Sequence, residues 1–197
     1  MLDHLQREVP VPSRPQRVIS LCPSITETLY DLGLGDRIVG RTRFCIHPMP
    51  AVKAATRVGG TKDLAYDRLH ALQPDLIIAE KEENTPEMVE RLARDYPVYV
   101  TDVVDLPSAL QMISDLGVLT GQAAPAQAMV GRLQAGLQRL KGVLPAQRCL
   151  YLIWQEPYMG VGSPTYIHSL LSHLGLHNLL AGRDDSRYPS LSLAEMQ

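Results

Sequence analysis

The hydrophobic and polar pattern of residues 17–40 predicts a strand, a helix and a second strand. The apolar run Val18–Leu21 is short enough for a buried parallel strand, and Pro23 ends it. Ser24 and Glu27 then have the S-x-x-E spacing of a capping box, which favours a helix N-terminus. A glycine stop and a second strand follow, at Gly33 or Gly35 and at Arg37–Gly40. The segment is predicted to form one βαβ unit, which leaves free N–H groups at the carboxyl edge of a sheet, where α/β folds bind ligands.

The same alternation continues to residue 101. Strand-like runs occur at Arg17–Leu21, Arg37–Gly40, Asp75–Ala79 and Val98–Thr101. Helical patterns lie between them at Asp67–Leu72 and at Thr85–Asp95, the second with a threonine cap and a proline in its first turn. Strands that alternate with helices predict a parallel sheet with right-handed crossovers.

From Leu106 the pattern becomes helical only. A first helix is predicted over Leu106–Leu119, and a second follows one apolar face from Ala126 to Leu140. A helix of about 18 residues spans about 27 Å, the width of a small domain, and could bridge two lobes.

The strand-helix alternation then restarts. Arg148–Trp154 reads as an apolar strand, Ser163-Pro164 opens a helix that ends at Gly175, and Ser190 or Ser192 caps a helix that begins at Leu193. These few elements are too short a series to cover both faces of a parallel sheet.

The predicted class is therefore α/β, with two Rossmann-like lobes that contain parallel sheets and are joined by one long backbone α-helix, the second lobe being incomplete. The predicted boundaries are an extended N-terminal arm at 1–16, an N-terminal α/β lobe at 17–121, an interlobe helix at 122–144 and a truncated C-terminal lobe at 145–197.

Composition narrows the class of protein. The chain has 197 residues, 45% of them hydrophobic, which suits a globular core. A net charge of -2, with one Phe and one Trp, gives no basic surface or stacking platform for nucleic acid. No run approaches a membrane span and the first residues lack the apolar core of a signal peptide, which predicts a cytoplasmic chain as it stands. Three scattered cysteines without a C-x-x-C pair argue against a zinc knuckle or a disulfide framework.

Six blocks of sequence resemble the class III periplasmic substrate-binding proteins of ABC transporters, which take up cobalamin, haem and ferric siderophores. The resemblance covers Arg17 to Gln197 and is strongest to the cobalamin-binding branch and to its relatives known as helical-backbone metal receptors. The blocks are RVISLCPSITETLYDLGLGDRIVG, GRTRFCIHP, VGGTKDLAYDRLHALQPDLIIA, EENT, RCLYLIWQEPYMGVG and YPSLSLAEM. Each block alone is weak, but their order and spacing are specific.

The resemblance implies a protein that captures a metal chelate in the cleft between its lobes without transforming it and without a catalytic cofactor. It also implies docking onto an ABC permease through one carboxylate in each lobe, at the positions of Asp67 and Glu195. If the family role holds and a leader is missing, the compartment is periplasmic or otherwise extracytoplasmic.

Loops that leave the carboxyl ends of the strands are expected to reach the ligand. The expected ligand-binding residues are Pro23, Ser24, Arg43, Phe44, Cys45, Thr61, Lys62, Glu80, Glu82, Asn84, Trp154, Glu156 and Tyr158. Where the resemblance places tryptophans that stack on a corrin, this chain has Thr61 and Glu80, which argues against cobalamin itself because aromatic area supplies much of the affinity for a flat ligand.

Two further chemistries are open at this site. Cys45 and His47, with Glu80 or Glu82, could ligate a transition metal, although the spacing favours the simpler interpretation of a packed thiol and a surface imidazole. Arg43 and Lys62 could pair with carboxylates on a chelate, or equally with Glu80, Glu82 or Glu83 of the protein itself.

Catalysis is the alternative class of function. The first turn, C-P-S-I-T, has no dinucleotide fingerprint, and the chain has neither a Walker loop nor a G-x-S-x-G elbow. The alternative is a cytoplasmic enzyme or a metal or ligand sensor that kept the fold without export.

Overall fold

The computed structural model describes residues 1–183 and 186–196 and divides into two compact units. The first unit contains Met1–Asp102 and Met112–Ala128, and the second contains Val103–Gln111 and Met129–Gln197. The two units are described separately below.

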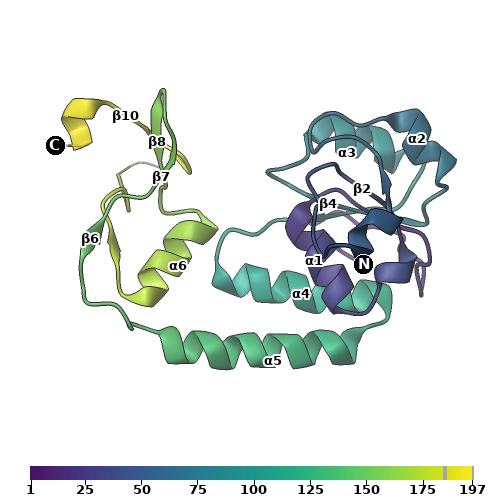
Figure 1. The fold of residues 1–197 in the computed structure, drawn as a ribbon, viewed down its shortest axis with the longest axis horizontal. Coiled ribbons are helices and arrows are strands. Elements are labelled where there is room, and N and C mark those ends of the chain that lie inside the picture. Colours follow the sequence, from purple (N-terminus) through teal and green to yellow (C-terminus); the bar gives the residue numbers. More distant parts are fainter. Residues whose placement is uncertain (184–185, 197) are drawn as a thin grey trace. The chain divides into compact units, whose positions relative to one another are not determined.

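The first unit is built on a five-stranded parallel sheet with the order β3-β2-β1-β4-β5 (Figure 1). Its strands are β1 (Val18–Ser20), β2 (Ile38–Arg41), β3 (Thr56–Arg57), β4 (Leu76–Glu80) and β5 (Val98–Thr101). Four of them lie within two residues of the predicted runs. The fifth, β3, has only two residues, too few for a periodic pattern to show.

Helices connect these strands and cover both faces of the sheet (Figure 1). They are α1 (Pro23–Asp31), α2 (Tyr66–Ala71) and α3 (Pro86–Ala93), with short 3-10 helices at Gly35–Arg37 (η1) and Ala51–Ala54 (η2). In Figure 1, α2 and α3 lie on one side of the sheet and α1 on the other.

Strand alternation divides the core between these two faces. On the face of α2 and α3, Ile19, Ile77 and Val100 pack with Leu69 and Leu92 in one buried cluster. The neighbouring strand positions are also buried and point to the opposite face, and they include Val18, Leu76, Ile78 and Tyr99. Burial on both faces explains why these strands are continuously apolar.

Helix ends in this unit follow local signals, with one exception. The Thr85 hydroxyl accepts a hydrogen bond from the Met88 amide at 3.3 Å, as the predicted cap requires. The predicted Ser24–Glu27 capping box is wrong. Helix α1 begins at Pro23, its N-cap is Cys22, and no side chain caps it. A proline fits the first helical position because its missing N–H would have no partner there.

The N-terminal segment differs from the extended arm that was expected. Leu2 and Glu8 pair in an antiparallel bridge, and the buried carboxylate of Asp3 accepts hydrogen bonds from the Leu5 and Arg7 amides. The His4 amide donates to the Val100 carbonyl at 3.1 Å. This tight hairpin therefore covers the outer edge of β5.

Two long helices continue the chain from the first unit. They are α4 (Leu106–Thr120) and α5 (Ala123–Leu140), the latter of 18 residues, and the bounds of both lie within three residues of the predicted helices. The division between the units falls within each helix. The predicted lobe boundaries and the role of 122–144 as an interlobe helix remain predictions.

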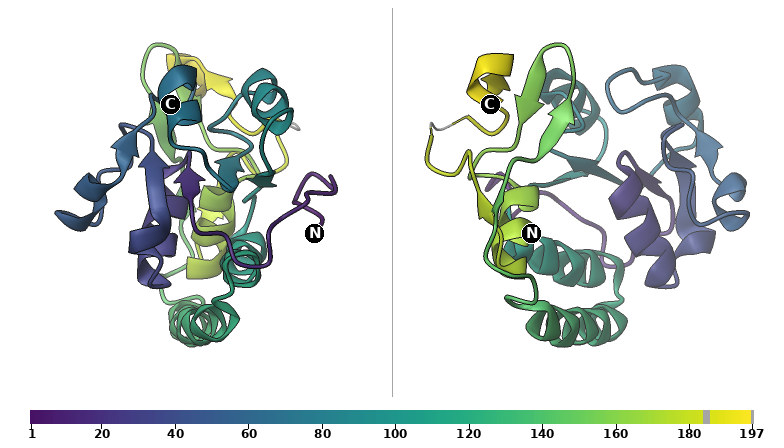
Figure 2. Two further views of the ribbon diagram at one scale, coloured as in Figure 1. Left: turned by 90° about the vertical axis from the view of Figure 1, so that its right-hand side faces the viewer. Right: turned by 60° about the vertical axis from the view of Figure 1, so that its left-hand side comes forward.

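The second unit has short strands around one helix. A three-stranded antiparallel sheet has the order β10-β8-β7, and a separate pair joins β6 to β9 in parallel (Figure 2). The bounds are β6 (Arg148–Cys149), β7 (Leu152–Trp154), β8 (Tyr158–Gly160), α6 (Tyr166–Leu174), β9 (His177–Asn178), β10 (Ser190–Leu191) and the 3-10 helix η3 (Leu193–Met196).

This unit departs from the parallel sheet expected for it. The predicted strand Arg148–Trp154 divides into β6 and β7, and β7 turns back into β8 instead of passing into a crossover helix. Helix α6 ends as predicted at Gly175, which adopts a left-handed conformation at its C-cap (φ 100°). Its predicted start at Ser163-Pro164 is wrong, because Thr165 is the N-cap and the helix begins at Tyr166. The α/β class is confirmed for the protein, while the sheet of this unit is mainly antiparallel within the described residues.

Candidate functional site

The candidate site of the first unit is the carboxyl edge of its parallel sheet. Loops leave this edge after β1, β2, β3 and β4, so residues far apart in the chain meet there. The ten ligand-binding residues predicted for the N-terminal lobe lie at the ends of these strands, in these loops or, for Pro23 and Ser24, in the first turn of α1. They are Pro23, Ser24, Arg43, Phe44, Cys45, Thr61, Lys62, Glu80, Glu82 and Asn84. Whether they contact a ligand remains a prediction.

Asn84 joins three of these loops. Its side chain is 3% exposed, and its amide nitrogen donates to the Thr61 carbonyl at 2.9 Å and to the Leu21 carbonyl at 3.4 Å. Its side-chain oxygen accepts from the Glu80 amide at 2.9 Å. The loops after β1, β3 and β4 are thus held together by one buried amide.

Glu80 ends β4 with its carboxylate turned into the next loop. The side chain is buried, and Oε2 accepts hydrogen bonds from the Glu82 and Glu83 amides at 2.7 and 3.0 Å. Burial raises the pKa of Glu80 above its ordinary value, these two amides lower it, and nearby Glu82 and Asp102 raise it again. A carboxyl group of raised pKa therefore lies at this edge of the sheet.

The cations at this edge have partners within the protein. Arg43 forms a two-pronged pair with Asp63, with N–O distances of 2.8 and 3.1 Å, and the Lys62 ammonium donates to the Glu82 carbonyl at 3.0 Å. The Arg43 guanidinium also lies 4.9 Å from the centre of the Phe44 ring, which is 50% exposed. Phe44 therefore presents an open aromatic surface beside a fixed cation.

The turn that carries Asp63 depends on a glycine. Gly59 has φ 121°, and a Cβ there would clash with the Asp63 carbonyl oxygen. The Gly60 amide donates to that carbonyl at 2.7 Å. This glycine pair therefore forms a tight turn, which a residue with a side chain at position 59 could not adopt without strain.

Cys45 and His47 lie in different surroundings. Cys45 is 1% exposed, and its sulfur is 3.1 Å from the Thr42 hydroxyl, whereas His47 is exposed. The buried Arg41 guanidinium donates to the Cys45 carbonyl at 2.9 Å and to the Val52 carbonyl at 2.7 Å, which fixes this loop. Among the residues that the structure describes, no group of three or more His, Cys, Asp or Glu side chains is placed to hold a metal ion. Metal ligation by Cys45 and His47 stays a prediction that no geometry here supports.

The turn after β1 carries Cys22, Pro23 and Ser24. The Ser24 hydroxyl lies 3.3 Å from the Cys22 sulfur. Burial raises the pKa of the Cys22 thiol to about 11, although the Ser24 hydrogen bonds oppose this. Cys22 is thus a protonated, packed thiol at neutral pH.

The second unit carries its predicted residues on the β7–β8 hairpin. Trp154 ends β7 with its side chain 64% exposed, Glu156 lies exposed in the turn, and Tyr158 begins β8. The hairpin brings these three residues together, and their contact with a ligand remains a prediction.

The two predicted docking carboxylates are both at the surface. Asp67 lies exposed in the first turn of α2. Glu195 lies in η3, where it accepts hydrogen bonds from the amide and hydroxyl of Ser192 at 2.8 Å and pairs with Arg183. The Ser192 hydrogen bonds, followed by Arg183, lower the pKa of Glu195 to about 2. Each unit therefore presents one such carboxylate.

Sequence reasoning missed four residues that shape the edge, namely Arg41, Asp63, Lys81 and Asp102. Lys81 and Asp102 form an ion pair at 2.6 Å between the loops that follow β4 and β5. Their positions directly after strand ends were the available signal. Their pairing depends on the strand order and could not be read from the sequence.

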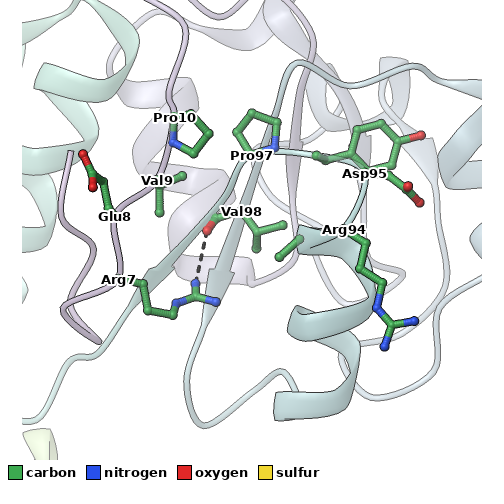
Figure 3. Close-up of a pocket in the computed structure, with 10 residues that line it drawn as sticks. Arg7, Glu8, Val9, Pro10, Arg94, Asp95, Pro97 and Val98 are labelled. Carbon is green, nitrogen blue, oxygen red and sulfur yellow. Dashed lines mark hydrogen bonds between the residues drawn. The ribbon is translucent and has the colours of Figure 1, made fainter.

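A pocket of about 380 Å³ lies away from this edge, between the N-terminal segment and the turn before β5 (Figure 3). In Figure 3 the Arg7 guanidinium points to the Val98 carbonyl, to which it donates at 3.2 Å, and the rings of Pro10 and Pro97 lie above it. The lining includes none of the predicted ligand-binding residues. It consists of Arg7, Glu8, Val9, Pro10, Ala93, Arg94, Asp95, Tyr96, Pro97 and Val98.

The first unit has a parallel sheet with polar loops at its carboxyl edge, the place where open α/β folds bind ligands. Residues 18–197 match the periplasmic binding protein family, and the chain belongs to that family. This is a family of binding proteins and not of enzymes, as the resemblance implied.

Individual relatives agree with this assignment. The chain is 28% identical over 184 residues to the vitamin B12-binding protein of Pectobacterium atrosepticum, covering 89% of this chain and 64% of the relative. It is 25% identical over 185 residues to the vitamin B12-binding protein of Vibrio campbellii, covering 92% of this chain and 66% of the relative. The chain thus spans slightly less than two thirds of the length of these relatives.

Solved structures share the fold. The vitamin B12 binding protein BtuF of Vibrio cholerae superposes with a TM-score of 0.81 at 24% identity, over 94% of this chain and 73% of that one. A periplasmic heme binding protein from Pseudomonas aeruginosa gives a TM-score of 0.81 at 25% identity, over 92% and 68%.

In the described part of the chain, no helix combines the length and the apolar character that crossing a bilayer requires.

Proposed function

We propose that this protein captures a metal chelate, either a corrinoid, a haem or a ferric siderophore, as the substrate-binding component of an ABC-type uptake system. The observation that carries the proposal is the loop cluster at the carboxyl edge of the first sheet, which is locked by Asn84 and displays Phe44 beside Arg43. An exposed aromatic ring supplies area for a flat chelate, and the nearby guanidinium and ammonium groups suit carboxylates or amide oxygens on its rim.

The relatives support this class of ligand. Their names state binding of vitamin B12 or heme, and one solved neighbour is described as a possible iron-binding periplasmic protein. A further neighbour is an ABC transporter substrate-binding protein. Membership of the periplasmic family supports a periplasmic or otherwise extracytoplasmic site of action for this chain.

The chelate proposal is tested by binding to the full chain. Cyanocobalamin, dicyanocobinamide, hemin and a ferric hydroxamate siderophore are each titrated calorimetrically and in thermal unfolding. At least one is expected to saturate at one equivalent and to raise the melting temperature, because a ligand that binds only the folded state stabilises it. If none of the four shifts the melting temperature or releases heat, the proposal fails.

We also propose that Asp67 and Glu195 contact a membrane permease. Both are exposed and neither lies in the candidate ligand loops. The double variant Asp67→Ala, Glu195→Ala is expected to retain chelate affinity within about twofold and to lose most chelate-stimulated ATP hydrolysis by the reconstituted transporter. Unchanged stimulation would exclude these carboxylates from docking.

A further inference from the structure

The N-terminal segment places the imidazole of His4 between two distant parts of the first unit. The side chain is 13% exposed, and its Nε2 lies 3.0 Å from the Asp115 carboxylate on α4. Its Nδ1 lies 3.0 Å from the backbone nitrogen of Asp102, directly after β5. His4 itself is held by its amide, which donates to the Val100 carbonyl, and its ring meets the edge of Tyr99.

Both ring nitrogens have partners. Nε2 faces the Asp115 carboxylate, while Nδ1 lies within hydrogen-bond distance of the Asp102 backbone, 3.0 Å from its nitrogen and 3.2 Å from its carbonyl oxygen. The imidazole therefore fixes the backbone at Asp102. Segment 103–111 belongs to the second unit, and the chain re-enters the first unit at Met112. Asp102 lies just before this segment and Asp115 shortly after it, so His4 contacts the first unit on both sides of the segment.

Asp102 passes this constraint to the candidate site. Its Oδ2 pairs with the Lys81 ammonium at 2.6 Å, and the Lys81 amide donates to the Thr101 carbonyl at 3.0 Å. The Oδ1 atom of Asp102 is buried and has no hydrogen-bond partner among the described residues, so Lys81 is the residue that fixes the Asp102 carboxylate. Lys81 belongs to the loop that Glu80 and Asn84 organise.

We propose that His4 is a positioning residue for the loop Glu80–Asn84, acting through Asp102 and Lys81. No step of this path is local in sequence, since 98 residues separate His4 from Asp102 and 21 separate Lys81 from Asp102. The proposal rests on the proposed function, because that loop is part of the chelate-binding edge.

A double-mutant cycle tests the path by affinity. Wild type, His4→Ala, Lys81→Ala and the double variant are titrated with hemin and with cyanocobalamin. For whichever of the two chelates binds to wild type, His4→Ala is expected to weaken the affinity by about fivefold. In the Lys81→Ala background the same change is expected to have almost no further effect, because both changes remove the same constraint. His4→Gln, whose amide carries both a donor and an acceptor, is expected to restore most of the affinity.

Hydrogen exchange of the unliganded full chain tests the positioning separately. The amides of residues 81–84 are expected to exchange faster in His4→Ala than in wild type. The matched control is His70→Ala, since His70 is also partly buried in the first unit and its Nδ1 lies 2.7 Å from the Tyr96 hydroxyl. This control is expected to leave residues 81–84 unchanged.

The outcomes separate the two proposals. Faster exchange at residues 81–84 together with no chelate binding by wild type would support the positioning and overturn the proposed function. Chelate binding with the same affinity and the same exchange in wild type and His4→Ala would overturn the positioning and leave the function standing. If His4→Ala does not fold, His4→Phe, which keeps a ring of similar volume and lacks both nitrogens, replaces it in the same two measurements.

Discussion

The side-chain amide of Asn84 donates a 2.9 Å hydrogen bond to the carbonyl oxygen of Thr61, 23 residues earlier in the chain. This contact ties the loop after β4 to the loop after β3 at the edge where the ligand is proposed to bind. Because Asn84 is almost fully buried, removing its side chain would leave the backbone groups that it bonds without a hydrogen bond to water in its place.

Asn84→Ala is therefore expected to lower the free energy of unfolding by about 1–3 kcal/mol and to increase hydrogen exchange at residues 59–63. Asn178→Ala is the matched control, since Asn178 is buried in the second unit and donates to the Val161 carbonyl at 2.8 Å. It is expected to destabilise the protein similarly without changing exchange at residues 59–63. Equal exchange at that loop in both variants would contradict the role given to Asn84.

The exposed ring of Phe44 is expected to contribute to affinity and not to stability. Phe44→Ala is expected to weaken chelate binding by about three- to tenfold, since an aromatic contact adds about 0.5–1.5 kcal/mol beyond its buried area. Ile46→Ala is the control, because Ile46 lies in the same loop and is 54% exposed. Calorimetry should show a loss of chelate affinity for Phe44→Ala and none for Ile46→Ala. Equal losses of affinity in the two variants would show that the Phe44 ring has no specific role in binding.

Glu80 is expected to make stability depend on pH in the unusual direction. Burial raises its pKa in the folded state above the ordinary value of 4.5, so the folded protein binds more protons than the unfolded chain between those two values. This contribution to stability is present below pH 4.5 and is lost as the pH rises through the raised pKa. Compared with wild type, Glu80→Gln is expected to gain melting temperature between about pH 4 and about pH 7.

Glu87 supplies a control of opposite sign. Its pKa is lowered by its own backbone amide and by the Thr85 hydroxyl, so its contribution is present above pH 4.5 and is lost as the pH falls. Glu87→Gln is expected to lose melting temperature relative to wild type over the same pH range. If the melting temperatures of Glu80→Gln and Glu87→Gln, each relative to wild type, change with pH in the same direction, the raised pKa of Glu80 does not contribute to the pH dependence of stability.

The two threonine caps report on the units one at a time. Thr85 caps α3 in the first unit, and Thr165 caps α6 in the second, accepting from the His168 amide at 3.2 Å. Each change to alanine is expected to cost about 1–2 kcal/mol, with the larger loss at Thr165, which is buried and also donates to the Gly162 carbonyl. In exchange-detected unfolding, Thr85→Ala should destabilise the amides of residues 86–93 and Thr165→Ala those of residues 166–174. Equal losses everywhere in both variants would mean that the units unfold together.

Much of the fold was readable from local patterns. The strands β4 and β5, the helices α4 to α6 and the Thr85 cap follow directly from apolar periodicity and from capping residues. The Ser24 cap failed because Pro23 competes for the same helix start, and local rules do not rank the two signals. The β7–β8 hairpin was missed because a short apolar run does not reveal whether the chain turns back or crosses over.

The candidate site divides in the same way. Residues at or shortly after the end of a strand, such as Glu80 and Arg43, could be predicted because parallel strands bring their carboxyl ends to one edge. The packed Cys45 thiol and the exposed His47 also agree with one of the two interpretations that the sequence offered. The link from His4 through Asp102 to Lys81 could not be predicted, because it depends on which loops become neighbours.

The sequence by itself determined the succession of strands and helices and the α/β class, because each depends on periodicities and caps that act over a few residues. Tertiary structure alone decided that Asn84 binds three loops, that Arg43 pairs with Asp63 and that the N-terminal segment covers β5. These contacts join residues that are tens of positions apart, and only the strand order of the folded sheet brings their polar groups within hydrogen-bonding distance.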